Sequence, residues 1–83
     1  MNDLARNPQQ LGTLIRRARR KQGLSQGALG EKAGLRQETI SLLETGNPAA
    51  KLETVLAVLA ALGLEMQVAP RSQGQPADIE GLF

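Results

Sequence analysis

Residues 26–45 have the sequence QGALGEKAGLRQETISLLET, and their pattern determines the fold. The serine just before them is a good helix N-cap, and Gly34 suits the left-handed conformation that ends a helix. We therefore expect one short helix over residues 26–33 and a second over residues 37–45. Gly30 lacks a side chain, which favours the close approach of another helix there. Five apolar residues supply the contacts between the two helices: Leu29, Ala33, Leu35, Ile40 and Leu43.

Two further helices flank this pair. Asn7 is suited to be an N-cap, Pro8 suits the first helical position, and Gln10 completes a pattern similar to a capping box. The first helix then continues to Gly23, with apolar residues at helical spacing. A last helix is expected over residues 52–62.

The last helix is unusually apolar, because every residue from 55 to 62 is apolar. A surface helix is apolar over only part of its circumference, so this one needs a partner besides its own core. Residues 64–68 alternate with a period of two, which predicts a strand that pairs with a second copy or lies as an extended tail. Both features favour a homodimer, although burial of the helix in a compact monomer is the alternative. The expected interface residues are Val58, Leu62, Leu64, Met66 and Val68.

The composition excludes several classes of function. The 83 residues suffice for one small domain; they include no Cys, His, Trp or Tyr, and a single aromatic residue, Phe83. This excludes zinc sites, thiol or imidazole catalysis, and aromatic platforms for single-stranded nucleic acid. With no nucleophile–base pair or metal-ligand set, we expect no enzyme activity and no cofactor. With no apolar run of transmembrane length and no signal peptide, we expect a soluble cytoplasmic protein.

Charge is distributed unevenly, although the net charge is only +2. Residues 14–36 hold seven of the ten basic residues and one acidic residue, whereas residues 37–83 hold two basic and six acidic residues. The basic segment predicts a surface that faces a polyanion, the alternative being a solvated helix face. Consecutive helical residues lie about 100° apart, so the cations of residues 16–21 cannot all face a phosphate backbone. The phosphate contacts expected from them are Arg16, Arg20 and Lys21.

Three segments are expected along the chain: an N-terminal arm over residues 1–7, one domain over residues 8–69 and a tail over residues 70–83. Pro, Ser, Gln and Gly in the tail are typical of a mobile segment. Its apolar end has two interpretations, a docking site for a partner and a frayed terminus without a role. The residues concerned are Ile79, Leu82 and Phe83.

Three stretches together resemble a known family. LSQGALGEKAGLRQETISLLETG, residues 24–46, has helix-turn-helix form and resembles the Xre/Cro-type helix-turn-helix family. With NPAAKLETVL (47–56) and LGLEM (62–66), the chain most resembles the HipB-like antitoxins, over residues 11–69. The resemblance implies an all-α, compact four-helix domain like that of lambda repressor, with one short C-terminal β-strand that pairs across a homodimer. It also implies binding to operator DNA and to a HipA-type kinase toxin, with repression of their operon.

The resemblance also assigns a recognition helix to residues 37–45. Gln37, Glu38 and Ser41 match positions that contact bases in the major groove. By residue type, Gln37 suits adenine, Glu38 suits the N4 amino group of cytosine, and Ser41 donates or accepts. Leu42 lies where the family often has a polar residue, and two interpretations stay open: contact with a thymine methyl group, or packing as a partly buried residue.

Four more residues match family positions. Gln26 matches a residue that binds a phosphate with its side chain and its helix N-terminus, the alternative being an ordinary exposed residue. Arg36 replaces the Ser or Thr N-cap common in the family, which suggests either a phosphate or guanine contact or a tolerated surface residue. Arg19 and Glu44 match a pair that fixes the first helix against the third.

The function expected from the sequence is that of a homodimeric, sequence-specific repressor that binds a palindromic operator of double-stranded DNA, associated with the nucleoid when bound. The resemblance makes it the antitoxin of a HipA-like kinase toxin. A stand-alone phage-type or metabolic regulator is one alternative. A protein-interaction module that binds no DNA is another.

Overall fold

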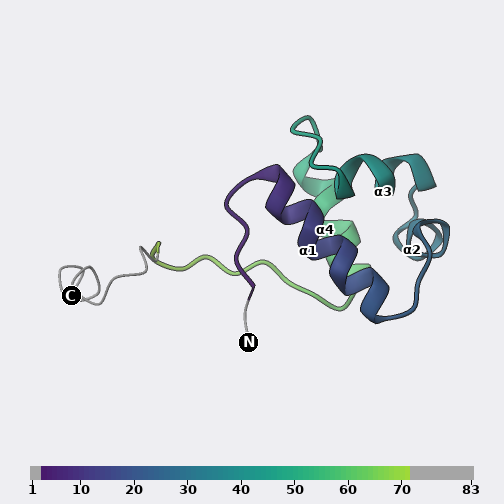
Figure 1. The fold of residues 1–83 in the computed structure, drawn as a ribbon, viewed down its shortest axis with the longest axis horizontal. Helices are drawn as coiled ribbons and strands as arrows, with labels where there is room; N and C mark the ends of the chain where they lie inside the picture. The colour runs from purple at the N-terminus through teal and green to yellow at the C-terminus, as the bar shows by residue number, and fades with distance from the viewer. Residues whose placement is uncertain (1–2, 72–83) are drawn as a thin grey trace.

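The computed structural model describes residues 3–71 and contains four α-helices in this part of the chain. They are α1 (Pro8–Lys21), α2 (Gln26–Ala33), α3 (Gln37–Glu44) and α4 (Leu52–Ala61). α3 packs against α1 and α2, and α2 also packs against α4. The residues after α4 run back past the N-terminal arm and only then extend away from the helices (Figure 1). The all-α prediction is confirmed, although α3 and α4 each end one residue earlier than predicted. None of the four helices is long and apolar enough to cross a membrane.

Local capping interactions fix the starts of α1 and α2. Oδ1 of Asn7 accepts a hydrogen bond from the backbone N–H of Gln10 at 2.7 Å, and Oγ of Ser25 accepts one from Ala28 at 3.0 Å. Both are the N-cap interactions that the sequence predicts. The side chain of Gln10 accepts from the N–H of Arg6 at 2.6 Å, one residue earlier than in a standard capping box.

The turn between α2 and α3 is tight because of two glycines. Gly34 has a φ of 74°, in the left-handed region that disfavours other L residues. The N–H of Leu35 donates to the carbonyl of Gly30 at 2.7 Å, and a Cβ on Gly30 would lie 2.7 Å from the carbonyl oxygen of Leu35. The close approach predicted at Gly30 is therefore present. The prediction that another helix makes it is wrong, because the backbone of the turn lies there.

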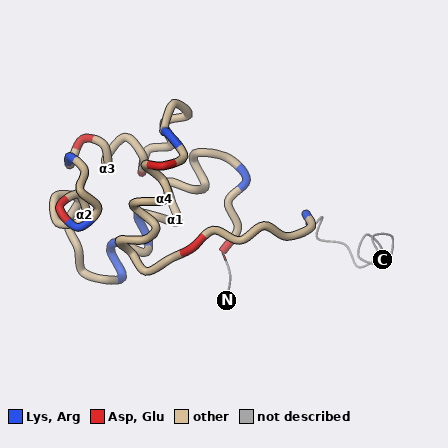
Figure 2. The backbone as a smooth tube through the Cα atoms, turned by 180° about the vertical axis from the view of Figure 1, so that it is seen from behind, with Lys and Arg blue, Asp and Glu red and all other residues tan. Residues whose placement is uncertain are grey.

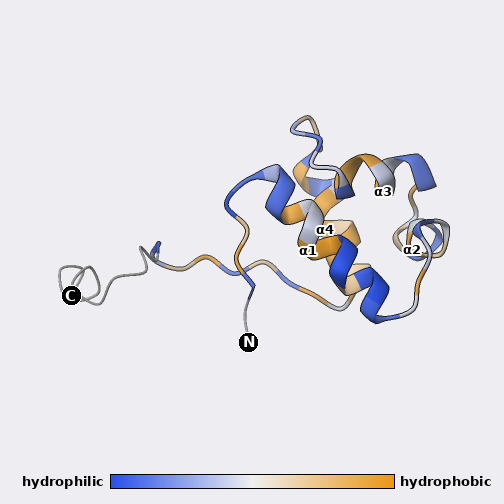
Figure 3. Ribbon diagram, viewed as in Figure 1, coloured by the Kyte–Doolittle hydropathy of each residue, from blue (hydrophilic) through white to orange (hydrophobic). Residues whose placement is uncertain are grey.

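All four helices contribute to one core. Figure 3 shows hydrophobic residues along the sides of α1, α3 and α4 that face one another. The core residues are Ile15, Leu29, Ile40, Leu43, Val55, Val58, Leu59 and Leu62. Val58 and Leu62 are 0% and 4% exposed, so their prediction as dimer-interface residues is wrong: packing within this chain already buries them.

α4 has a second apolar face, which is exposed. Leu52 is 62% exposed, Leu56 44% and Leu64, just beyond the helix, 43%. Ala60 is also exposed, and the four residues follow one another at intervals of four. Residues four apart lie on the same side of a helix, so Leu52, Leu56 and Ala60 form one line; these three, with Leu64 just beyond the helix, are called the α4 stripe below. Burial in a compact monomer therefore accounts for only one face of α4.

The residues after the stripe have no regular secondary structure up to residue 71. Met66 is 52% exposed and Val68 is fully exposed. The predicted strand over residues 64–68 is not formed in this single chain, because a strand needs a neighbouring strand to satisfy its backbone groups. Its pairing across a dimer stays a prediction.

The crossing of α1 and α3 depends on Gly12, which the sequence analysis did not single out. Gly12 is buried, and a Cβ on it would lie 2.6 Å from the carbonyl oxygens of both Leu43 and Glu44. The missing side chain lets the backbone of α1 approach the last carbonyls of α3. Glycine is therefore required here by interhelical distance and not by its backbone conformation.

Gly12→Ala should lower the free energy of unfolding by about 2 kcal/mol, because the new methyl group clashes with backbone that cannot move aside. Gly27→Ala is the matched control, since the nearest atom to its Cβ would be Ser25 Oγ at 3.9 Å. There the better helix propensity of alanine should raise stability by up to about 1 kcal/mol. Urea unfolding of both variants measures the difference, and equal stability of Gly12→Ala and the parent would contradict the proposed crossing.

Candidate nucleic-acid interface

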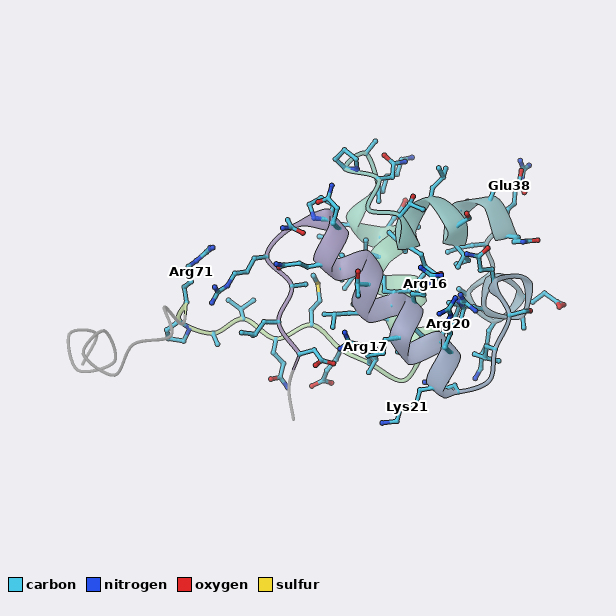
Figure 4. All side chains as sticks on the ribbon, viewed as in Figure 1. Arg16, Arg17, Arg20, Lys21, Glu38 and Arg71 are labelled. Atoms are coloured by element: carbon cyan, nitrogen blue, oxygen red, sulfur yellow. The ribbon has the colours of Figure 1, made fainter. Side chains whose placement is uncertain are left out.

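α3 presents a mixed outer face beside its buried one. Ile40 is fully buried, which turns residues on the other side of the helix outward. Gln37 and Glu38 are exposed, Ser41 is half-buried, and Leu42 is 53% exposed. Figure 4 shows Glu38 at the N-terminal end of α3, pointing away from the other helices. Leu42 is not among the hydrophobic residues packed against the core, which argues against its interpretation as a packing residue; its contact with a thymine methyl group stays a prediction.

The cations of α1 point in two directions. Five of the ten Lys and Arg residues lie in the second half of this helix, and the others are spread along the chain (Figure 2). Arg16 and Arg20 point toward α2 and α3, whereas Arg17 and Lys21 point to the opposite side (Figure 4). This division follows from helical geometry, because residues four apart share a face. Arg16 and Arg20 therefore lie with the candidate surface, and the structure does not bring Lys21, a predicted phosphate contact, to it.

A buried ion pair joins α1 to the end of α3. Arg19 donates from Nε to Oε2 of Glu44 at 2.6 Å and from Nη2 to Oε1 at 3.0 Å. Its Nη1 donates to the carbonyl of Leu24, before α2, at 2.8 Å. Each partner is 8% exposed, and the described residues leave no buried side-chain polar atom without a hydrogen bond. Each guanidinium nitrogen and each carboxylate oxygen of the pair thus makes at least one hydrogen bond inside the domain, which fixes α1, α3 and the start of α2 relative to one another.

Gln26 belongs to the same network. Its Nε2 donates to Oε1 of Glu44 at 3.2 Å, so its side chain is half-buried instead of freely exposed. Nothing in the local sequence pattern relates residue 26 to the end of α3, so this contact was not predicted. The interpretation as an ordinary exposed residue is wrong. Its phosphate contact stays a prediction, and the bond to Glu44 holds the residue at the N-terminus of α2.

The pKa of Glu44 reflects opposing effects. Burial raises it, but hydrogen bonds from Arg19 and Gln26, with the positive charges of Arg19 and Arg16, outweigh burial and hold the pKa below its ordinary value. The hydrogen bond to Glu44 in turn raises the pKa of Arg19, against the effect of burial. The pair is therefore ionised near neutral pH.

Arg36 occupies the N-cap position of α3, and its side chain makes no capping hydrogen bond. The residue is exposed at the same end of α3 as Gln37 and Glu38. Its guanidinium group therefore lies at the end of α3 that carries the predicted base contacts. Both interpretations made from the sequence, a DNA contact and a tolerated surface residue, stay open.

The described part of the chain contains no cluster of three or more acidic, His or Cys residues able to hold a metal ion. The candidate site is instead a surface composed of the outer face of α3, the N-terminus of α2 and one side of α1. Its chemistry consists of amide, carboxylate, hydroxyl and guanidinium groups. Such groups form hydrogen bonds with base edges and phosphates.

Comparison with known proteins identifies the class. Residues 15–68 match the helix-turn-helix family HTH_3, and the chain belongs to this family. It is 36% identical over 63 residues to the HTH-type transcriptional regulator y4mF of Sinorhizobium fredii, an alignment that covers 76% of this chain and 83% of that protein.

Solved structures share the fold of this chain. The fold is similar to a chain of the HipB-O4 20mer complex, with a TM-score of 0.80 and 28% identity over 86% of this chain and 100% of that one. It is also similar to a chain of the HipA-HipB-O2-O3 complex, with a TM-score of 0.77 and 30% identity over the same shares. The resemblance to the helix-turn-helix family and to HipB that the sequence predicts is confirmed.

Glu44→Gln should lower the free energy of unfolding by about 3 kcal/mol, because Arg19 then stays buried without its counter-charge. The double variant Arg19→Met/Glu44→Leu removes both charges, so its free energy of unfolding should fall by less than that of Glu44→Gln. Urea unfolding measures both. A double variant less stable than Glu44→Gln would show that the two side chains do not act as a pair.

The same pair predicts a dependence on pH. Because the pKa of folded Glu44 lies below its ordinary value, its contribution is complete above the ordinary pKa and is lost as pH falls through the lowered one. The parent should therefore lose stability below about pH 5 more steeply than Glu44→Gln. Urea unfolding at a series of pH values measures this, and an equal dependence of stability on pH in the parent and in Glu44→Gln would contradict the lowered pKa of Glu44.

Proposed function

We propose that this protein is a sequence-specific, DNA-binding transcriptional repressor that acts on its operator as a homodimer, at the nucleoid. The observation that carries the proposal is the exposure of Gln37 and Glu38 at the N-terminal end of α3, together with Arg16 and Arg20, which point from α1 toward α2 and α3. Membership of the helix-turn-helix family and the likeness to HipB in HipB-O4 20mer and HipA-HipB-O2-O3 complexes support it.

In the proposed complex, the N-terminal part of α3 enters the major groove. Gln37 pairs with adenine, Glu38 accepts from the N4 amino group of cytosine, and Ser41 forms a further hydrogen bond. Phosphates are bound around this helix by Gln26, Arg36, Arg16 and Arg20. Base contacts and phosphate contacts thus come from different residues, so their effects on binding are separable.

Gln37→Ala should weaken binding to the operator more than binding to a random duplex, because a base contact carries sequence information. Gln26→Ala should weaken both alike, because phosphates are the same in every sequence. Fluorescence anisotropy gives the ratio of the two affinities. It is measured with DNA from the protein's own promoter and with a random duplex, at about 150 mM salt. Equal affinity of the parent protein for the two duplexes would contradict the repressor proposal.

The homodimer is proposed to form through the α4 stripe and the segment that follows it. Leu52 and Leu56 are exposed leucines on one side of α4, and Leu64, Met66 and Val68 are exposed apolar residues in the segment after it. Burial of such a line against its twofold-related copy removes apolar area from water. Two α3 helices related by that axis contact a palindrome with half-sites about one helical turn apart.

Leu56→Glu should convert the dimer to a folded monomer, because it places a charge in the interface while the core stays intact. Leu42→Glu, an equal change at an exposed leucine of α3, should leave the dimer unchanged. Sedimentation velocity gives the oligomeric state, and circular dichroism confirms that the variants are folded. A Leu56→Glu protein that remains dimeric excludes the α4 stripe as the interface.

A HipA-type kinase toxin is the proposed partner, which makes this protein the antitoxin and autorepressor of their operon. One solved chain of similar fold belongs to a HipA-HipB-O2-O3 complex, which supports the proposal. The apolar residues considered for docking, Ile79, Leu82 and Phe83, lie outside the described residues. A kinase-like reading frame adjacent to this gene would favour the antitoxin, and its absence would favour a stand-alone regulator. Gel filtration with and without duplex DNA tests the alternative of an interaction module that binds no DNA.

A further inference from the structure

Leu42 is an apolar side chain on an otherwise polar surface. Among residues 3–71, the other large hydrophobic residues that are exposed lie in the N-terminal arm, on α4 or in the segment after α4. On α3, Ile40 and Leu43 are 0% and 4% exposed and supply the contact with the core, so packing does not require Leu42. Its side chain is available to a partner that faces the outer side of α3.

Leu42 lies directly beside Glu38 along the helix. The two are four residues apart, a separation of about 6 Å along the axis, which corresponds to between one and two base-pair steps of DNA. Helical side chains lean toward the N-terminus, so Leu42 covers the turn that carries Glu38. A base edge close to the carboxylate of Glu38 is therefore within reach of the leucine.

The major groove offers one apolar group, the C5 methyl of thymine. Leucine has no donor or acceptor, and it desolvates whatever it covers. A covered amino or carbonyl group loses its hydrogen bonds with water and gains none, which is unfavourable. A covered methyl group gains from burial.

We propose that Leu42 is a specificity-determining residue that recognises the C5 methyl group of a thymine in each half-site. That thymine lies one or two base pairs from the cytosine that pairs with Glu38. The inference rests on the proposed DNA binding and deepens it, because it names the chemical feature that an operator must carry. It also predicts that 5-methylcytosine at the same position is bound better than cytosine, since its methyl group occupies the same place.

Single replacement of thymine by deoxyuridine in the operator tests the proposal, because it removes only the methyl group. The operator is first located by footprinting on the protein's own promoter. At one thymine position per half-site, the replacement should weaken binding of the parent protein by about fourfold per half-site, the effect of one buried methyl group. Leu42→Ala should bind the thymine and deoxyuridine duplexes equally, and Glu38→Gln, the control on the same face, should keep the discrimination.

The outcomes separate the two proposals. If the parent prefers its operator but tolerates deoxyuridine at every position, or if Leu42→Ala keeps the discrimination, the role of Leu42 is wrong while the repressor proposal stands. If the parent shows no preference for operator over random duplex, both are wrong. Circular dichroism of Leu42→Ala should match that of the parent, because the residue lies outside the core.

Discussion

The bidentate pair between Arg19 and Glu44 is the interaction on which the arrangement of the first three helices depends. It links the last turn of α1 to the last residue of α3, and its remaining hydrogen bonds reach Leu24 and Gln26 at the start of α2. Two charges removed from water are stable only where their hydrogen bonds are complete. A different angle between α1 and α3 would leave some of these groups unpaired. The pair therefore specifies one relative orientation, where apolar packing alone would permit several.

That orientation divides the surface of the domain into two parts. The outer face of α3, with Arg16 and Arg20 of α1, is polar and contains most of the groups that suit nucleic acid. The α4 stripe carries exposed leucines and no such groups. α4 packs against α2, so the α4 stripe and the outer face of α3 belong to separate helices. A change in the residues of one surface can therefore leave the other unaltered.

The sequence predicted the features that depend on local chemistry. Asn7, Ser25 and Gly34 set helix ends through contacts within a few residues, and these predictions are confirmed. It failed where three-dimensional packing decides. Val58 and Leu62 were assigned to the wrong face, because a helix apolar on all sides gives no periodicity that shows which side is inward. The contacts of Gly12 and Gln26 join residues distant in the sequence, and no local pattern carries that information.

The exposed carboxylate of Glu38 affects how the proposed repressor would search a chromosome. In the proposed complex with a random duplex, this carboxylate would enter a groove lined by phosphates and would often find no cytosine amino group to accept from. The repulsion weakens such complexes and shortens their lifetime, whereas the operator compensates it with a hydrogen bond. A protein that leaves wrong sites quickly examines more sites in a given time. In the proposed repressor, this one acidic residue at the end of α3 would weaken binding to DNA while making the search for the operator faster.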